Sequence, residues 1–203
     1  RLVPAFLAAQ AAAGRPVAAL LRGAEGQRYT KGLRAAGYRP GPPLEHVAID
    51  FDDPLRAEHR ALFARLDDGR LNTIEIVQGP PGDHPDAARL LTAYLTAHPD
   101  HVLGAVDVAF ALAQPRTCLL ARDADGDARA LVVLTLGPRV MLDVLYGCGS
   151  PRQHVLAVLL ALRTIDRELD RDVDFFPMSP QVAALARRLG GRTRTRVEAW
   201  LPG

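Results

Sequence analysis

The chain has 203 residues, of which 48% are hydrophobic and 24% are charged, and its formal net charge is +2. This length can bury a sizeable core in one or two domains. So small a charge excess argues against a dedicated nucleic-acid binder, although nearly all the basic residues are arginine, with Lys31 the only lysine. A genome rich in arginine and alanine codons explains that bias. Because arginine grips phosphate and carboxylate with two parallel hydrogen bonds, a local anion site stays open.

The cysteines and the apolar runs indicate a cytosolic setting. Cys118 and Cys148 lie in apolar, strand-like runs without metal-ligand spacing, so we expect reduced core cysteines. No apolar run approaches the ~20 residues that span a bilayer. Residues 2–13 could be mistaken for a signal-peptide core, but Pro4 and Gln10 interrupt them and a strand pattern follows, which favours a buried helix.

The N-terminal third predicts alternating helices and strands, with a break at Gly37. In chain order we expect a helix over 2–13, a strand over 17–21, a helix over 27–36, a strand over 44–51 and a helix over 55–66.

The middle of the chain reads as a strand, two helices and three further strands. The expected ranges are 72–78 for the first strand, 84–97 and 102–113 for the helices, and 117–122, 128–136 and 139–146 for the other strands. The acidic turn at 123–127 contains an Asp-Gly pair, so it predicts a hairpin between the second and third of these four strands.

The two ends of the chain repeat one order of elements. Residues 153–169 predict a long apolar helix, followed by a strand over 173–177, a helix over 181–189, a Gly-Gly break and a strand over 196–201. The first 51 residues give the same helix, strand, helix, glycine and strand. Such self-similarity is the signature of an internal duplication.

The order of elements resembles the GNAT acyltransferase fold, an α+β class in which a splayed sheet opens a cleft beside the fourth strand. We therefore expect residues 1–52 to be the C-terminal part of a first GNAT-like unit and residues 53–203 to be a complete second unit. A first unit begun in mid-fold would leave a sheet edge uncovered, so upstream residues or a partner chain should complete it. A generic α+β domain is the alternative.

GNAT enzymes hold the pyrophosphate of coenzyme A on a loop of pattern Gln/Arg-x-x-Gly-x-Gly/Ala at a helix N-terminus. In this chain the matching stretch runs from Val144 through Gly147 and Gly149 to Arg152. Its glycines fit, but its first position departs from the pattern. A plain strand-to-helix turn explains the same residues, since Ser150 and a following proline are typical of a helix start.

Read end to end, the chain resembles the catalytic domain of the phosphatidylglycerol lysyltransferases and alanyltransferases, the MprF type. Five segments are similar, in order, to patterns of this family. Glu45–Phe51 resembles Gly-Glu-Glu-Ala-x-Val-Asp-Leu, Tyr94-Leu95 resembles Trp-Leu, and His101–Asp107 resembles Phe-Ser-Leu-Gly-x-Phe-Asp. Asp143–Tyr146 resembles Asp-Leu-Met-Arg, and Phe176–Ser179 resembles Ala-Pro-Leu-Ser. The match covers most of the chain in order. His46 stands in place of the second Glu, and Tyr146 in place of the Arg.

This resemblance implies transfer of an amino acid from an aminoacyl-tRNA to the glycerol hydroxyl of phosphatidylglycerol, without a metal or cofactor. The work would take place in the cytoplasm, at the inner face of the cell membrane, and an upstream membrane domain is a further expected partner. The site must hold the aminoacyl ammonium, stabilise the oxyanion and help deprotonate the lipid hydroxyl. The catalytic candidates are Asp143, Glu45 and Tyr146, and the substrate-binding candidates are His46, Asp107, Ser179, Gly147, Gly149 and Arg152.

Each candidate also has a structural explanation. Asp143 would serve equally well as a structural carboxylate paired with an arginine, and Glu45 and His46 as the solvent face of an edge strand. Ser179 suits a helix cap. The alternating arginines at 192, 194 and 196 are either a phosphate-binding stripe or a solvated strand face.

Two other functions stay open. One is a GNAT N-acyltransferase that uses acyl-CoA as donor. The other is a GNAT-like module that has lost its site and serves in binding or assembly, which the replacement of the family's arginine by Tyr146 favours.

Overall fold

A computed structural model of the protein describes residues 19–22, 26–51, 73–98, 108–148, 161–177 and 180–202, together with residues 9, 57, 58, 61, 158 and 159. The predicted helices over 2–13 and 55–66, and the first half of the predicted helix over 102–113, lie outside these ranges except for single residues.

The described elements follow the predicted order, with boundaries within a few residues except for longer second and last strands. The strands are β1 (Ala19–Arg22), β2 (Tyr38–Ile49), β3 (Thr73–Gly79), β4 (Arg116–Arg122), β5 (Ala128–Thr135), β6 (Val140–Gly147), β7 (Val173–Phe175) and β8 (Arg192–Pro202). The helices are α3 (Thr30–Ala35), α5 (Pro85–Ala97), α6 (Val108–Ala113) and α8 (Pro180–Arg188), with a 3-10 turn η1 (Pro81–Asp83) and a π-helical turn η2 (Ile165–Leu169).

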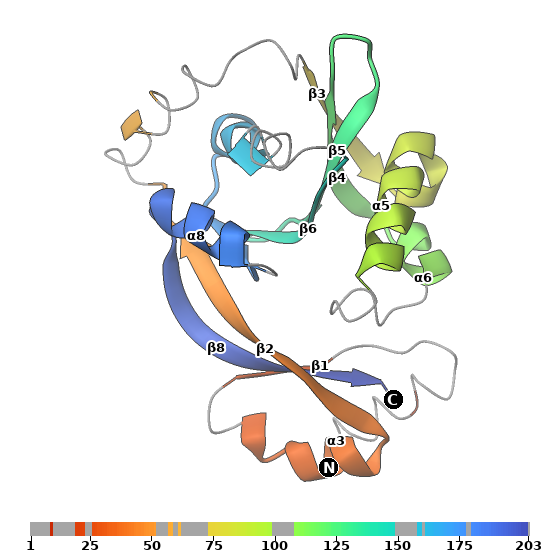
Figure 1. Ribbon diagram of the computed structural model, residues 1–203, viewed down its shortest axis with the longest axis vertical. Coiled ribbons are helices and arrows are strands. Elements are labelled where there is room, and N and C mark those ends of the chain that lie inside the picture. The colour runs from red at the N-terminus through yellow and green to blue at the C-terminus, as the bar shows by residue number, and fades with distance from the viewer. Residues whose placement is uncertain are drawn as a thin grey trace.

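All eight strands form one sheet in the order β1-β8-β2-β7-β6-β5-β4-β3 (Figure 1). Every neighbouring pair is antiparallel except β6 and β7, which run parallel. The N-terminal strand β2 thus lies between β7 and β8, which belong to the C-terminal repeat. The two repeats share one continuous sheet, while the division of the chain near residue 52 stays a prediction.

Helices cover both faces of the strands from β3 to β6 (Figure 1). On one face α5 buries Leu90, Leu91 and Tyr94 against alternate residues of β4 and β5, such as Leu120 and Leu131. On the opposite face the segment 161–169 and α8 bury the other set of alternate residues; that core includes Leu162, Ile165, Ala186, Leu119 and Val132. A sheet buried on both faces explains why these strands read as nearly continuous apolar runs.

The strands of the two repeats are related by an approximate two-fold axis in their ladder. A residue of β2 and its counterpart in β8 have numbers that differ by 153. Leu44 and Val197 are counterparts and also pair with each other in the ladder, so the axis passes between them. The pairs Glu45–Arg196 and Pro43–Glu198 exchange under this operation, and the two register shifts in the ladder exchange as well. The predicted duplication therefore extends to the register of the strands.

The helices of the two repeats end in the same way. Gly37 follows α3 and Gly190 follows α8, each with φ of 82°, and each donates its N–H to the carbonyl of the arginine three residues earlier. This is the left-handed helix terminus that glycine adopts without a steric cost.

Replacing Gly37 with alanine is expected to lower the free energy of unfolding by about 1 kcal/mol, because a Cβ is strained at positive φ. Apart from the chain neighbours, no atom of a described residue lies within 4 Å of the position that this Cβ would occupy, so the loss of stability reports the backbone strain. Urea unfolding measures it. Gly37→Asn is the control and should lose less, since asparagine tolerates this region; equal losses would contradict the assignment.

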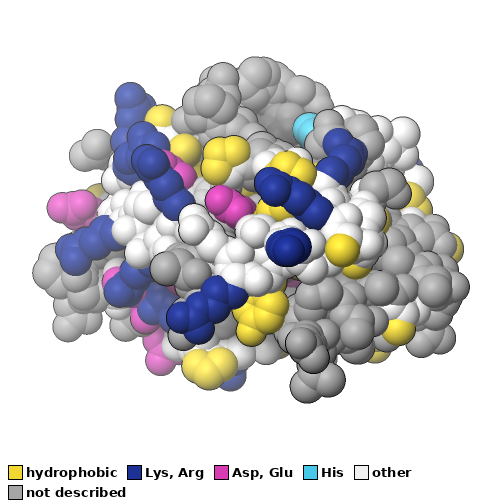
Figure 2. Space-filling view, turned by 90° about the horizontal axis from the view of Figure 1, so that it is seen from below, with side chains coloured by type: hydrophobic (Ala, Val, Ile, Leu, Met, Phe, Trp, Pro, Cys, Tyr) yellow, Lys and Arg dark blue, Asp and Glu magenta, His cyan; other side chains and the backbone are white. Residues whose placement is uncertain are grey.

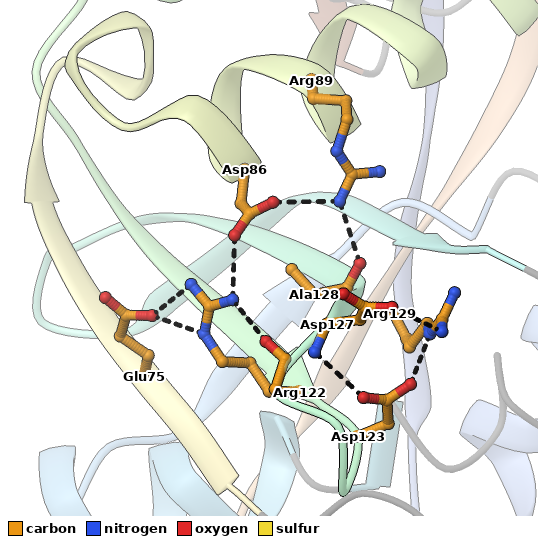
Figure 3. A network of polar contacts seen from close by, with 9 residues as sticks. Glu75, Asp86, Arg89, Arg122, Asp123, Asp127, Ala128 and Arg129 are labelled. Atoms are coloured by element: carbon orange, nitrogen blue, oxygen red, sulfur yellow. Dashed lines mark hydrogen bonds and ion pairs between the residues drawn. The ribbon is translucent and has the colours of Figure 1, made fainter.

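An ionic network fastens the start of α5 to the hairpin of β4 and β5 (Figure 3). The Arg122 guanidinium donates to Glu75 Oε2 on β3 at 2.8 Å and to Asp86 Oδ2 on α5 at 2.8 Å. Arg89 joins Asp86 Oδ1 and the Ala128 carbonyl, each at 3.1 Å. The hydrogen bond from Arg122 lowers the pKa of Glu75, and hydrogen bonds from Arg89 and Arg122 lower that of Asp86.

Arg122→Gln is expected to cost about 1 kcal/mol of stability at pH 7, a modest value because these groups are partly exposed. The folded pKa values of Glu75 and Asp86 are depressed, so their contribution is present above the unfolded values near 4 and is lost as the pH falls through the folded values. The difference between variant and wild type in urea unfolding should therefore shrink toward pH 3. Arg129→Gln, at the start of β5 where Arg129 pairs with Asp123 and Asp127 of the hairpin turn, is the control with a smaller expected effect.

Candidate functional site

The sheet divides at β6 and β7. Their parallel ladder joins Val140–Leu142 to Val173–Phe175. Beyond this point β6 continues to Gly147, whereas β7 ends at Phe175. At the same place β6 contains a β-bulge toward β5, because Leu142 pairs with Leu134 and Val144 with Val133, which leaves Asp143 as the extra residue. Bulges re-aim side chains and are frequent beside active sites.

Asp143 is held through one of its two carboxylate oxygens. Its Oδ2 accepts a hydrogen bond from the Arg116 guanidinium at 2.9 Å and another from the Thr135 hydroxyl at 2.5 Å. Its Oδ1 receives no hydrogen bond from any residue that the structure describes. The side chain of Asp143 is 16% exposed. The carboxylate is thus fixed in direction, and only one of its oxygens is engaged by the described residues.

The surroundings of Asp143 favour its protonated form more than water does. Burial raises the pKa of this carboxyl, and the Thr135 hydroxyl and the Arg116 charge offset only part of that effect. A carboxylate with a raised pKa is a better proton acceptor at neutral pH, as a general base requires. The sequence-based alternatives for Asp143, an arginine-paired carboxylate and a reactive one, are therefore both compatible with the observed contacts.

Tyr146 lies on β6 beneath α5. Its ring meets the ring of Tyr94 edge-on, with centroids 5.8 Å apart. Burial and the neighbouring Cys148 raise the pKa of the Tyr146 hydroxyl. Gly147 ends β6 and pairs with Ala130. Tyr94 is a core residue, and Tyr146 is partly exposed near the end of the strand where a substrate group could reach it.

Glu45 and His46 lie on β2, and the idea that they form the solvent face of an edge strand is wrong. β2 is an interior strand, because β7 and β8 flank it. His46 is buried, its Nε2 lies 3.5 Å from Asp174 Oδ1, and its ring packs on Phe176. Glu45 is partly exposed between the guanidinium groups of two arginines, Arg187 and Arg196, each 3.7 Å away.

These β2 residues are not brought into contact with Asp143. The strand β7 lies between β2 and β6, and two strand spacings amount to about 10 Å. A substrate of the size of an aminoacyl ester could span that distance, but Glu45 and Asp143 do not share a site by direct contact. Four other candidates, Asp107, Gly149, Arg152 and Ser179, lie outside the described residues and stay predictions.

Sequence reasoning missed the partners that fix the site. Arg116 and Thr135 flank apolar strands, and only the register of the sheet brings them to Asp143. It also missed Arg139, which joins three carboxylates: Asp50 Oδ1 at 2.8 Å, Asp172 Oδ2 at 2.9 Å and Asp174 Oδ1 at 3.0 Å. Asp172 directly precedes β7 and Asp174 lies in it, so two carboxylates around one short apolar strand were the available sequence signal.

Among the described residues, no group of three or more His, Cys, Asp and Glu side chains is arranged to hold a metal ion. None of the described helices combines the length and hydrophobicity that crossing a bilayer requires.

A mixed sheet that separates between two parallel strands, beside a bulge and between layers of helices, defines a GNAT-like acyltransferase fold. Comparison with known proteins agrees. No protein-family model matches the chain, and no curated protein matches it. Solved structures do match, at identities too low to show more than the fold.

A GCN5-related N-acetyltransferase from Kribbella flavida has a TM-score of 0.54 and 17% identity, over 98% of this chain and 77% of its own. The C-terminal domain of a putative lysylphosphatidylglycerol synthetase from Agrobacterium fabrum has a TM-score of 0.52 and 18% identity, over 100% and 73%. The L-PGS of Bacillus licheniformis has a TM-score of 0.52 and 12% identity, over 99% and 72%. The chain covers 64% of a functionally unknown conserved protein from Staphylococcus epidermidis ATCC 12228.

The expected fold is thus confirmed, and structures of the MprF type are among those the chain is similar to.

Proposed function

We propose that the protein transfers an aminoacyl group from an aminoacyl-tRNA to a hydroxyl acceptor, such as the glycerol of phosphatidylglycerol, at the inner face of the cell membrane. One observation carries this proposal: Asp143 lies in the bulge where β6 and β7 part, with Oδ2 held by Arg116 and Thr135 and with Oδ1 left for a substrate. The similarity to the lysylphosphatidylglycerol synthetase structures supports the aminoacylated lipid as product. The tRNA donor rests on the resemblance of the sequence motifs to the MprF type.

The chemistry is an exchange of esters. The acceptor hydroxyl oxygen attacks the carbonyl carbon of the aminoacyl ester, and its proton goes to Asp143 Oδ1. The bond to the ribose oxygen of the tRNA then breaks, and that oxygen takes the proton from Asp143 as it leaves, which restores the carboxylate. Because the donor ester is already activated, a positioned base and a stabilised oxyanion supply what the step needs. Tyr146, the nearest hydroxyl-bearing candidate on β6, would donate toward the oxyanion.

The test incubates the purified protein with a panel of aminoacyl-tRNAs, each carrying a labelled amino acid, and with vesicles that contain phosphatidylglycerol. Label in the lipid extract is the expected result for at least one amino acid. Vesicles without the anionic lipid are the control. If no member of the panel labels the lipid, the proposal fails.

A second candidate is an acyl-CoA-dependent N-acyltransferase. The similarity to the Kribbella flavida N-acetyltransferase favours it, since its TM-score of 0.54 exceeds the value of 0.52 for both synthetase structures. Saturable binding of coenzyme A, competed by acetyl-CoA, would support this candidate. Absence of both activities, with the fold intact, would leave a binding module.

A further inference from the structure

An open groove of about 530 Å3 lies between α3 and the ladder of β2 and β8, away from Asp143. Its walls combine polar side chains with prolines and an indole. The lining residues are Gln27, Thr30, Arg34, Pro40, Gly41, Pro43, Glu198 and Trp200. Figure 2 shows the molecule from this end, where basic side chains are spread over the surface with fewer acidic ones between them.

Two opposite charges line the groove, and neither is neutralised by a described residue. The guanidinium of Arg34 lies over the Trp200 ring, 5.5 Å from its centroid. Glu198 lies two residues before Trp200 on β8, and within the described ranges it forms no ion pair. Trp200 is buried, and its indole N–H finds no acceptor among the described residues. The groove therefore presents a guanidinium donor and a carboxylate acceptor that have no ionic partner among the described residues.

The approximate two-fold axis allows Arg34 and Glu198 to be compared with the corresponding residues of the C-terminal repeat. Counting back from the terminal glycines, Arg34 corresponds to Arg187, and by the strand relation Glu198 corresponds to Glu45. In the C-terminal repeat the corresponding side chains lie 3.7 Å apart, and Arg196 approaches Glu45 as well. The N-terminal repeat has Pro43 where the other has Arg196, and within the described ranges its glutamate and arginine form no ion pair.

We propose that this groove binds a free α-amino acid as its zwitterion, with the carboxylate on Arg34 and the ammonium on Glu198. Arginine suits a planar carboxylate because it can donate two parallel hydrogen bonds. A phosphate dianion would meet a single arginine and be repelled by Glu198, and a simple amine would be repelled by Arg34. Pro40 and Pro43 offer apolar surface for an amino-acid side chain.

The groove is a separate site from the acyltransferase cleft. Three strand spacings separate β8 from β6 across the sheet, or about 14 Å. The inference therefore does not depend on the proposed transfer reaction, and a failure of one leaves the other open to test.

The experiment titrates the purified chain with each standard L-amino acid by isothermal calorimetry, up to about 10 mM, which covers millimolar dissociation constants. At least one amino acid is expected to bind. Its amide, which lacks the carboxylate, and its N-acetyl derivative, which lacks the ammonium, should each bind at least about 10-fold more weakly because either Arg34 or Glu198 loses its charged partner on the ligand. Inorganic phosphate should not compete.

Variants locate the binding. Glu198→Gln and Arg34→Gln are each expected to weaken binding about 10-fold or more, whereas Lys31→Gln on the same helix and Asp125→Asn in a distant turn should leave it unchanged. All four positions are exposed, so the fold should survive, and circular dichroism checks this. The proposal is overturned if no amino acid binds, if phosphate or the N-acetyl derivative binds as well as the zwitterion, or if Asp143→Asn rather than Glu198→Gln removes binding.

Discussion

Replacing Asp143 with asparagine is expected to lower kcat for aminoacyl transfer by about 10²- to 10⁴-fold, the range that a general base contributes. Asparagine has the same shape and its oxygen can still accept from Arg116 and Thr135, but it cannot take a proton from the acceptor hydroxyl. Steady-state transfer of labelled amino acid into lipid measures the loss. Asp125→Asn makes the same change in an exposed turn and should retain wild-type activity.

The pH profile separates a base from a structural carboxylate. Activity should rise with pH through the pKa of Asp143, which burial raises above the ordinary aspartate value. The hydrogen bond from Thr135 lowers the pKa of Asp143, so Thr135→Val should raise this pKa and move the rising part of the pH–activity profile to higher pH. If Thr135→Val lowers activity equally at every pH, Asp143 positions the site rather than accepting a proton.

Most of the fold could be predicted because its elements carry strong local signals. The apolar runs of β4, β5 and β6, the Asp-Gly hairpin and the glycines after α3 and α8 each mark a strand, turn or helix end within a few residues. Neighbours in the sheet have no such signal. The insertion of β2 between β7 and β8 depends on long-range pairing. The repeat could therefore be predicted from the sequence, whereas the pairing of a strand of one copy with strands of the other could not.

The site was predictable to the extent that one polar residue interrupts an apolar strand. Asp143 stands out in β6 for that reason, but the bulge that turns it toward Arg116 and Thr135 depends on the register against β5. The reading of Glu45 and His46 as an exposed edge was wrong because edge or interior position is a property of the assembled sheet. His46 is buried beside Asp174 because β7 lies next to β2, and that neighbour could not be predicted from the sequence.

Replacing Arg139 with methionine is expected to lower the free energy of unfolding by about 1 to 2 kcal/mol at pH 7, because the groups are partly exposed. This is the largest stability effect expected here, since Arg139 joins three carboxylates. Methionine keeps the apolar stem but leaves Asp50, Asp172 and Asp174 facing one another without their shared cation. Removing one partner from a partly buried ionic network costs more than the network itself contributes, because Asp172 and Asp174 lose this cation while Asp50 keeps the Arg194 guanidinium. Urea unfolding at pH 7 measures the difference, with exposed Arg192→Met as the matched control.

The pH dependence of the stability difference between Arg139→Met and wild type distinguishes loss of the ionic network from loss of packing. Burial pushes the pKa of Asp50 upward, but the hydrogen bond and charge of Arg139, with Arg194, hold it below its ordinary value overall. A depressed folded pKa contributes stability above the unfolded value near 3.9, which is lost as the pH falls through the folded value. The gap between Arg139→Met and wild type should therefore narrow toward pH 3, whereas a packing defect would keep it constant. Because Arg139 joins the end of β2 to β7 beside the start of β6, the variant should also weaken transfer activity at neutral pH before it unfolds.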